Sequence, residues 1–122
     1  LAHVLVKQMK EQYPRVLGLR IYGSTPEKPK LQVMAATDES TIGTLGGDAE
    51  QSVIDKNIPY AGKFSEGIMV TLPLHDRNGD TIAALRVEMK SFPGQTDRNA
   101  LARALPIARE MEKRMTGARE LF

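Results

Sequence analysis

The sequence predicts an α+β domain with a central antiparallel sheet of four to five strands and with the N- and C-terminal helices on one face. Residues 67–89 indicate a β-hairpin, because two apolar runs alternate with period two around an Asn-Gly turn at residues 76–80. Residues 1–13 and 97–115 each carry one apolar stripe with helical spacing. Such helices pack most economically together on the single apolar face of the sheet.

The first elements follow from local periodicity. A helix is expected over residues 1–13, since its apolar residues recur at i, i+3, i+4 and i+8. These residues are Leu1, Val4, Leu5 and Met9. Strands are expected over residues 16–22 and 31–36. Alternation directs Leu17, Leu19 and Ile21 to one face and Arg20 and Tyr22 to the other. In the second strand it separates Leu31, Val33 and Ala35 from Gln32 and Met34.

Residues 37–63 show the weakest periodicity. Asp48 is expected to cap a short helix over residues 49–56, because its carboxylate can accept from the free amides of the first turn. A short strand is expected over residues 60–64. The last helix should begin at Thr96 or Asp97, and Pro106 inside it predicts a bend because proline removes one helical hydrogen bond.

Length and composition exclude several classes of protein. The chain has 122 residues, which predicts one domain over residues 1–116 and a tail over residues 117–122. Absence of cysteine excludes disulfides and thiol nucleophiles, and two histidines leave little for a metal centre. A net charge of +2 with interspersed signs is not typical of nucleic-acid binding. No apolar run approaches the roughly 20 residues that span a bilayer. Because the chain begins at Leu1 rather than Met, we expect it to be trimmed from something longer.

A pocket is predicted between the second face of the sheet and residues 37–63, since the helices use the other face. Its lining is expected to be Arg20, Tyr22, Met34, Thr71 and Arg86, with Tyr60 from the covering segment. Two arginines suit a small anion such as a carboxylate, which guanidinium binds bidentately. A plain ion pair between Arg86 and Glu88 on a solvated face is the more common explanation of the same pattern.

Other candidate sites are weaker. His75 is predicted to be a solvated turn residue, because Asp76 points to the opposite face of a strand, and His3 is expected on the surface. The glycines of residues 43–47 lack the features of a phosphate-binding loop and indicate a lid or connection. Residues 76–80 lack the glutamate of a calcium loop, whose twelfth position is occupied by Val87. No metal, cofactor or catalytic residue is therefore predicted.

The hairpin over residues 70–87 resembles the closing hairpin of bacterial PAS-like and Cache-like sensory domains. The shared features are a strand that ends in Pro-Leu, an Asp-x-x-Gly turn and a strand of small and aliphatic residues. GAF and profilin-like domains can present the same signal. The resemblance implies a signalling domain that binds a small molecule on one sheet face and dimerises through its terminal helices. It also implies a periplasmic or secreted location, with the cytoplasm as the alternative.

The sequence thus predicts a sensory domain that binds a small anionic molecule non-covalently. The alternative is an interaction module whose helices, residues 1–9 and 101–115, dimerise or dock on a partner without any small molecule. An enzyme is not predicted, because no nucleophile, acid-base pair or metal cluster stands out.

Overall fold

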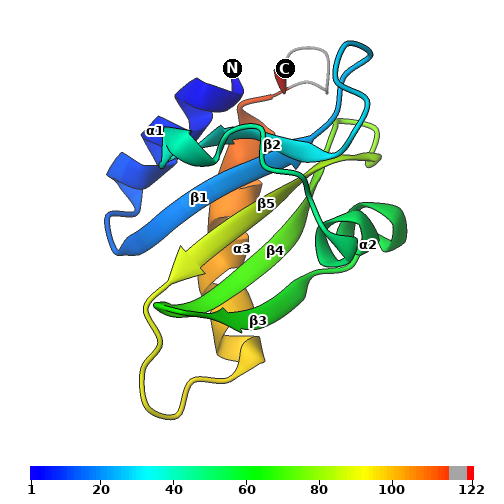
Figure 1. The fold of residues 1–122 in the computed structure, drawn as a ribbon. Helices are drawn as coiled ribbons and strands as arrows, with labels where there is room; N and C mark the ends of the chain where they lie inside the picture. Colours follow the sequence, from blue (N-terminus) through cyan, green and yellow to red (C-terminus); the bar gives the residue numbers. More distant parts are fainter. Residues whose placement is uncertain (116–120) are drawn as a thin grey trace.

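Five antiparallel strands form one sheet in this computed structural model, which describes residues 1–115, 121 and 122 (Figure 1). The strand order is β2-β1-β5-β4-β3. The strands are β1 (Val16–Gly23), β2 (Gln32–Ala36), β3 (Tyr60–Phe64), β4 (Gly67–His75) and β5 (Thr81–Met89). The helices are α1 (Ala2–Gln12), α2 (Asp48–Lys56) and α3 (Asp97–Lys113), with a short 3-10 turn η1 (Glu39–Thr41). The predicted α+β class and antiparallel sheet are confirmed.

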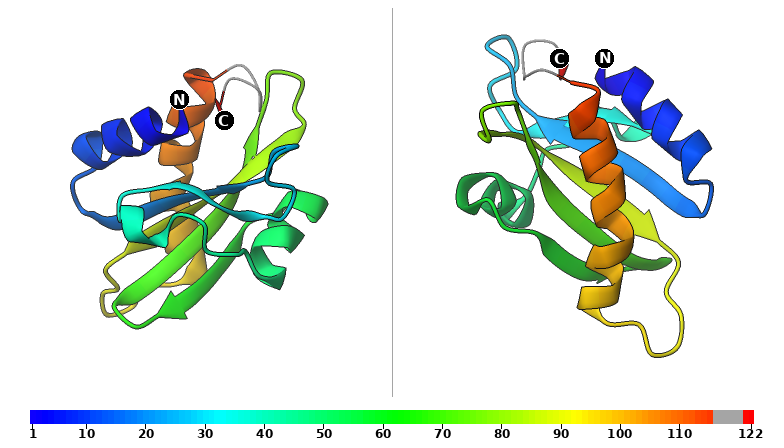
Figure 2. Two further views of the ribbon diagram at one scale, coloured as in Figure 1. Left: turned by 45° about the horizontal axis from the view of Figure 1, so that its top comes forward. Right: turned by 180° about the vertical axis from the view of Figure 1, so that it is seen from behind.

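The helices lie on both faces of the sheet. Helices α1 and α3 lie together on one face, as predicted, and α2 lies against the other (Figure 2). The larger core lies between α1, α3 and the sheet, whereas a smaller one joins Val53 of α2 to Tyr22 and Ala84. The second face is therefore only partly covered. Among the described residues, no helix combines the length and the apolar character needed to cross a membrane.

The end of the chain returns to the larger core. Leu121 is buried there, and the ring of Phe122 lies against Gly23. Both residues fall within the tail predicted for residues 117–122. The rest of that prediction concerns residues outside the described part of the chain.

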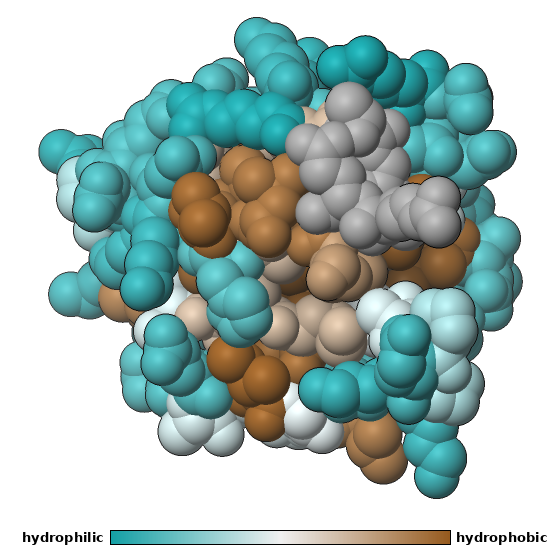
Figure 3. All heavy atoms as spheres, turned by 90° about the horizontal axis from the view of Figure 1, so that it is seen from above, coloured by the Kyte–Doolittle hydropathy of each residue, from teal (hydrophilic) through white to brown (hydrophobic). Residues whose placement is uncertain are grey.

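Helix α1 turns a slightly different side to the sheet than its sequence predicts. Its buried residues are Ala2, Leu5, Val6 and Met9, whereas Leu1 and Val4 are 39% and 50% exposed. On the face of the molecule where both termini lie, hydrophobic side chains gather in the middle and hydrophilic ones surround them (Figure 3). Since Leu1 and Val4 are exposed, part of the predicted apolar stripe of α1 remains on the surface of this chain.

Helix α3 begins where predicted. The Thr96 hydroxyl caps it by accepting from the backbone N–H of Asn99 at 3.1 Å. The helix continues through Pro106, which is exposed. Ala104, Ala108, Met111 and Met115 are buried as expected, but Leu101 and Leu105 are only half-buried.

Two β-bulges change the predicted faces. In β1, Val16 pairs with Met89 and Gly18 with Glu88, so Leu17 is an extra residue that lies 42% exposed while Val16 is buried. In β2 the register shifts at Met34, and Val33 rather than Met34 joins Tyr22 on the second face. The predictions that Leu17 faces the core and that Met34 faces the pocket are wrong, because one extra residue reverses the alternation.

The β4–β5 turn and the start of α2 follow local hydrogen bonds. Asp76 Oδ1 accepts from the backbone N–H groups of Asn78 and Asp80, which confirms the turn. At α2 the cap is Gly47, whose N–H donates to the Glu50 carboxylate at 3.1 Å. The prediction that Asp48 is the cap is therefore off by one residue, since Asp48 already lies in the first helical turn.

Candidate functional site

An open hollow of about 390 Å³ lies on the second face, over β1 and β5 and between the segment after β2 and the β3–β4 turn. Strands β1 and β5 supply the central charged residues, and the flanking loops supply the rim. The lining residues are Leu17, Gly18, Leu19, Arg20, Thr37, Asp38, Phe64, Ser65, Glu66, Arg86 and Glu88. Two of the six predicted site residues, Arg20 and Arg86, belong to this lining.

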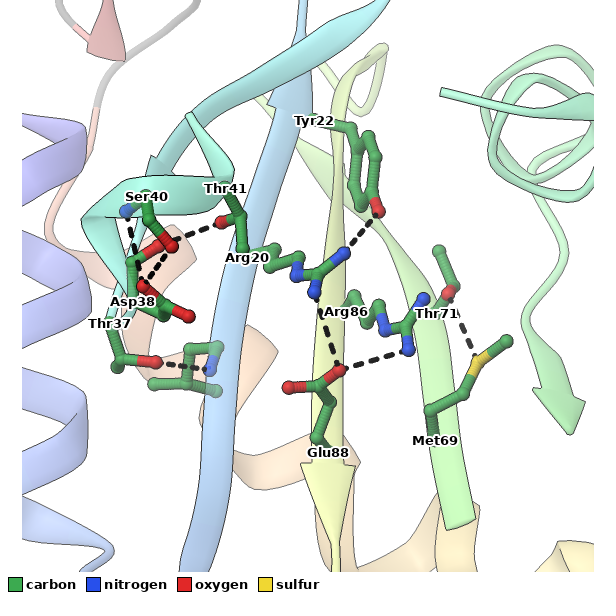
Figure 4. Close-up of polar contacts among 11 residues, drawn as sticks. Arg20, Tyr22, Thr37, Asp38, Ser40, Thr41, Met69, Thr71, Arg86 and Glu88 are labelled. Carbon is green, nitrogen blue, oxygen red and sulfur yellow. Dashed lines mark hydrogen bonds and ion pairs between the residues drawn. The ribbon is translucent and has the colours of Figure 1, made fainter. Parts of the chain in front are cut away.

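Strand register places four of the predicted residues in one row across the sheet. Arg20 lies directly opposite Arg86, Arg86 opposite Thr71, and Thr71 opposite Tyr60. Paired residues on adjacent strands project from the same face, as alternation predicts for Arg20, Arg86 and Thr71. Tyr60, which was expected in the covering segment, belongs instead to the sheet. Arg20, Arg86 and Glu88 point toward one another over this face (Figure 4).

Glu88 joins the two arginines. Its Oε2 atom lies 2.9 Å from Arg86 Nη2 and 4.0 Å from Arg20 Nη2, and its side chain is 15% exposed. Like charges directly opposite each other destabilise a sheet, and Glu88 offsets part of that repulsion. The Arg86–Glu88 pair expected as the alternative explanation is thus present, and Arg20 also takes part in it.

The Arg86 guanidinium has two further features. It lies over the ring of Phe64, with 5.7 Å between Cζ and the ring centroid, a distance typical of cation–π contacts. Its Nε atom is buried and has no hydrogen-bond partner in the part of the chain that the structure describes. An unsatisfied buried donor costs about 1–3 kcal/mol, so an acceptor supplied from outside would stabilise this arrangement.

Gly18 and Thr37 shape the hollow, and neither was predicted from the sequence. A Cβ atom on Gly18 would lie 2.6 Å from Glu88 Oε1, so a larger residue here would make the end of the Glu88 side chain move. Thr37 Oγ1 accepts from the Leu19 N–H at 3.1 Å, which fixes the segment after β2 against β1. A glycine inside a predicted strand was the available signal, since it often marks a close approach.

Asp38 brings a second carboxylate to the rim. It accepts from the Ser40 hydroxyl at 2.6 Å and from the Ser40 backbone N–H at 3.1 Å. These hydrogen bonds, aided by the charge of Arg20, lower the pKa of Asp38 below its usual value. Asp38 therefore stays negatively charged at neutral and mildly acidic pH.

The other four predicted site residues lie elsewhere or deeper. Tyr22 is buried under α2, and its hydroxyl accepts from Arg20 Nη1 at 3.5 Å. Thr71 is fully buried and donates to the sulfur of Met69. Tyr60 is 44% exposed and lines a separate hollow of about 340 Å³ beside α2. Met34 is the extra residue of its bulge and does not line the hollow.

His75 does not behave as a solvated turn residue, and that prediction is wrong. Its ring Nδ1 lies 2.7 Å from Glu112 Oε2 of α3, and its Nε2 contacts Asn57 Oδ1 at the end of α2. His3 is exposed, as predicted. Within the described residues, no three acidic, histidine or cysteine side chains gather as metal ligands would.

Comparisons with known proteins identify the type of fold. No protein-family model and no curated protein match the sequence. Among solved structures, the GAF domain of a phosphoenolpyruvate-protein phosphotransferase from Acinetobacter matches 92% of this chain and 78% of its own, with a TM-score of 0.62 and 14% identity. The GAF domain of a two-component sensor histidine kinase from Bacillus halodurans matches 90% of both chains, with a TM-score of 0.62 and 10% identity.

Enzymes share this fold as well. The type II free methionine-R-sulfoxide reductase from Thermoplasma acidophilum matches 91% of this chain and 86% of its own, with a TM-score of 0.57 and 16% identity. Other matching structures are reductases of the same activity. The prediction that this protein is not an enzyme is corrected by these matches, because the fold supports catalysis in other proteins. The comparisons show the GAF-type fold of this chain.

Proposed function

We propose that this chain is a small-molecule-binding sensory domain whose ligand lies non-covalently over Arg20 and Arg86. The observation that supports this most directly is the placement of the two arginines opposite each other on β1 and β5. Such a like-charge pair lowers the stability of the sheet, and Glu88 lies closer to Arg86, at 2.9 Å, than to Arg20, at 4.0 Å. An anion in the adjacent hollow would relieve the repulsion, since guanidinium groups bind carboxylates through paired hydrogen bonds.

The charges around the hollow favour a ligand that carries a carboxylate and also a positive group. Glu88 already shares both arginines, and Asp38 and Glu66 bring further carboxylates to the lining. A purely anionic ligand would meet these carboxylates as well as the guanidinium groups. A zwitterion such as an amino acid can place its carboxylate on Arg86 and its ammonium group toward Asp38. We therefore propose an amino-acid-like ligand.

The sensory part of the proposal is supported by the fold. One structural neighbour is the GAF domain of a two-component sensor histidine kinase, and it matches 90% of each chain. In the present chain the hollow lies on the sheet face opposite α1 and α3, so a ligand there would leave both terminal helices accessible to other proteins. Ligand binding and the transmission of a signal to a partner protein would then use opposite faces of one sheet.

Thermal unfolding with a panel of probes tests the proposal. The probes are the common amino acids and, for each, the matching acid without its amino group, such as propionate for alanine. A ligand at one hundred times its Kd stabilises the native state by about 2.7 kcal/mol, which is a readily measured shift in Tm. We expect at least one amino acid to raise the Tm and its amino-free analogue to raise it less.

Variants locate the effect. Arg86→Ala and Arg20→Ala should each abolish the ligand-induced shift, whereas Arg77→Ala, in the exposed β4–β5 turn, is the matched control and should retain it. Glu88→Gln should keep the fold and bind simple carboxylates better, because the arginines are then free. The proposal fails if no probe shifts the Tm, or if the shift persists in both Arg20→Ala and Arg86→Ala.

A further inference from the structure

A second pair of hollows lies on the opposite side of the molecule, where the end of α1 meets α3. They measure about 350 and 460 Å³, and they adjoin because Tyr13 lines both. Figure 2 shows α1 and α3 side by side on this face of the sheet. Apolar side chains from α3 and the sheet contribute to the lining, among them Val16, Met89, Leu105 and Ile107, and Tyr13 follows the end of α1. We call the two hollows together the α1–α3 groove.

Cations dominate the edges of the α1–α3 groove. Arg15 and Arg103 line one hollow, and Arg109 and Lys113 line the other. Among the residues that the structure describes, the single carboxylate in the lining is Glu110. The whole sequence has a net charge of only +2, so positive charge is denser along this groove than over the chain as a whole. Such a surface attracts acidic partners and repels basic ones.

The one carboxylate is already neutralised. Glu110 Oε1 lies 2.9 Å from Arg114 Nη2, and Glu110 Oε2 lies 3.9 Å from Lys113 Nζ. Neither Arg15 nor Arg109 forms an ion pair with any residue that the structure describes. Both of these arginines are exposed and therefore accessible to carboxylates of another molecule.

The groove is also held in shape before any partner binds. Arg114, which caps the end of α3, donates to Gln8 Oε1 at 2.8 Å and to Gln12 Oε1 at 3.2 Å, which ties α3 to α1. Arg103 lies over the ring of Phe92, with 5.5 Å between Cζ and the ring centroid, and Phe92 is 46% exposed beside the groove. A preformed groove lowers the ordering cost of binding.

We propose that the α1–α3 groove binds an acidic amphipathic segment of a partner protein, with apolar side chains against Tyr13 and Leu105 and carboxylates toward Arg103 and Arg109. A second copy of this chain is a poorer occupant. In a symmetric dimer the same patch is used on both copies. The cationic edge of one groove would then lie against the cationic edge of the other, which is unfavourable. The proposal does not depend on the small-molecule site, which lies on the other face of the sheet.

A synthetic probe tests this surface. The probe is a fluorescent peptide with leucine at i, i+3, i+4 and i+7 and glutamate at the remaining positions, titrated with the intact chain and followed by anisotropy. We expect saturable binding that weakens as salt rises, because the rim contacts are electrostatic. A peptide in which lysine replaces every glutamate should not bind.

Charge reversal locates the binding. The double variant Arg103→Glu/Arg109→Glu should weaken the glutamate peptide at least about tenfold, a change of about 1.4 kcal/mol. Lys28→Glu/Arg77→Glu reverses the same number of exposed charges in the β1–β2 and β4–β5 loops and should change Kd by less than about twofold. Circular dichroism establishes that both variants are folded.

Three outcomes overturn the proposal. The glutamate peptide shows no saturable binding, or both double variants lose affinity equally, which would indicate a general charge effect. Alternatively, sedimentation shows a dimer of this chain that Arg103→Glu/Arg109→Glu dissociates. In that case the α1–α3 groove is an interface between two copies.

Discussion

His75 and Glu112 are joined twice, because the ring Nδ1 and the backbone N–H of His75 each lie 2.7 Å from the same carboxylate oxygen, Oε2. On its other side the His75 ring contacts Asn57, the left-handed residue that ends α2. Thr81 of β5 also donates to the Asn57 side chain, at 3.0 Å. His75 therefore connects α3, on one face of the sheet, to α2, on the other.

Glu112→Gln should destabilise the native state by about 1–2 kcal/mol, because a half-buried hydrogen bond to a charged acceptor is replaced by a neutral one. Chemical denaturation measures the change. Glu11→Gln, on the exposed side of α1, is the control and should shift the midpoint little. Equal midpoints for the two variants would mean that the His75–Glu112 contact contributes nothing measurable.

Gly18→Ala should destabilise the protein by about 1 kcal/mol or less, since the new methyl group would displace the Glu88 carboxylate and weaken its ion pair with Arg86. The same substitution in a Glu88→Ala background should cost much less, because the obstacle is gone. Urea midpoints of the four proteins complete a double-mutant cycle. If the free-energy changes of Gly18→Ala and Glu88→Ala simply add in the double variant, Gly18 does not make room for Glu88.

Alternation alone could predict that Arg20, Arg86 and Thr71 share one face, because β1, β5 and β4 keep their register there. The place of Tyr60 in the same row follows from the pairing of β3 with β4, which local alternation does not predict. Alternation failed at Leu17 and Met34, where a single extra residue reverses which side faces the core. The partner of His75 could not be predicted, since Glu112 lies 37 positions further along the chain. Packing of α3 on the sheet, rather than any local pattern, brings the two together.

Salt dependence should reveal the repulsion between Arg20 and Arg86. In Glu88→Ala the two guanidinium groups lose the carboxylate they share, so stability should fall at low salt and partly recover as salt rises. Urea midpoints at about 0.05 M and about 0.5 M sodium chloride measure this recovery. Glu27→Ala, in the exposed β1–β2 loop, serves as the control. A recovery no larger than that of the control would contradict the repulsion between Arg20 and Arg86.

Asp38 should titrate below the usual pKa of an aspartate, and Ser40→Ala should raise its pKa, because the hydroxyl that donates to the carboxylate is removed. Since folding lowers the pKa, the stabilising contribution of ionised Asp38 is fully present above the ordinary aspartate pKa. It is lost as the pH falls through the lower pKa of the folded state. Carboxyl carbon chemical shifts followed by NMR from neutral to acidic pH measure both values. Asp55, an exposed carboxylate of α2, provides an internal comparison in the same spectra. If Asp38 titrates at the same pH in the parent protein and in Ser40→Ala, the Ser40 hydroxyl does not lower the pKa of Asp38.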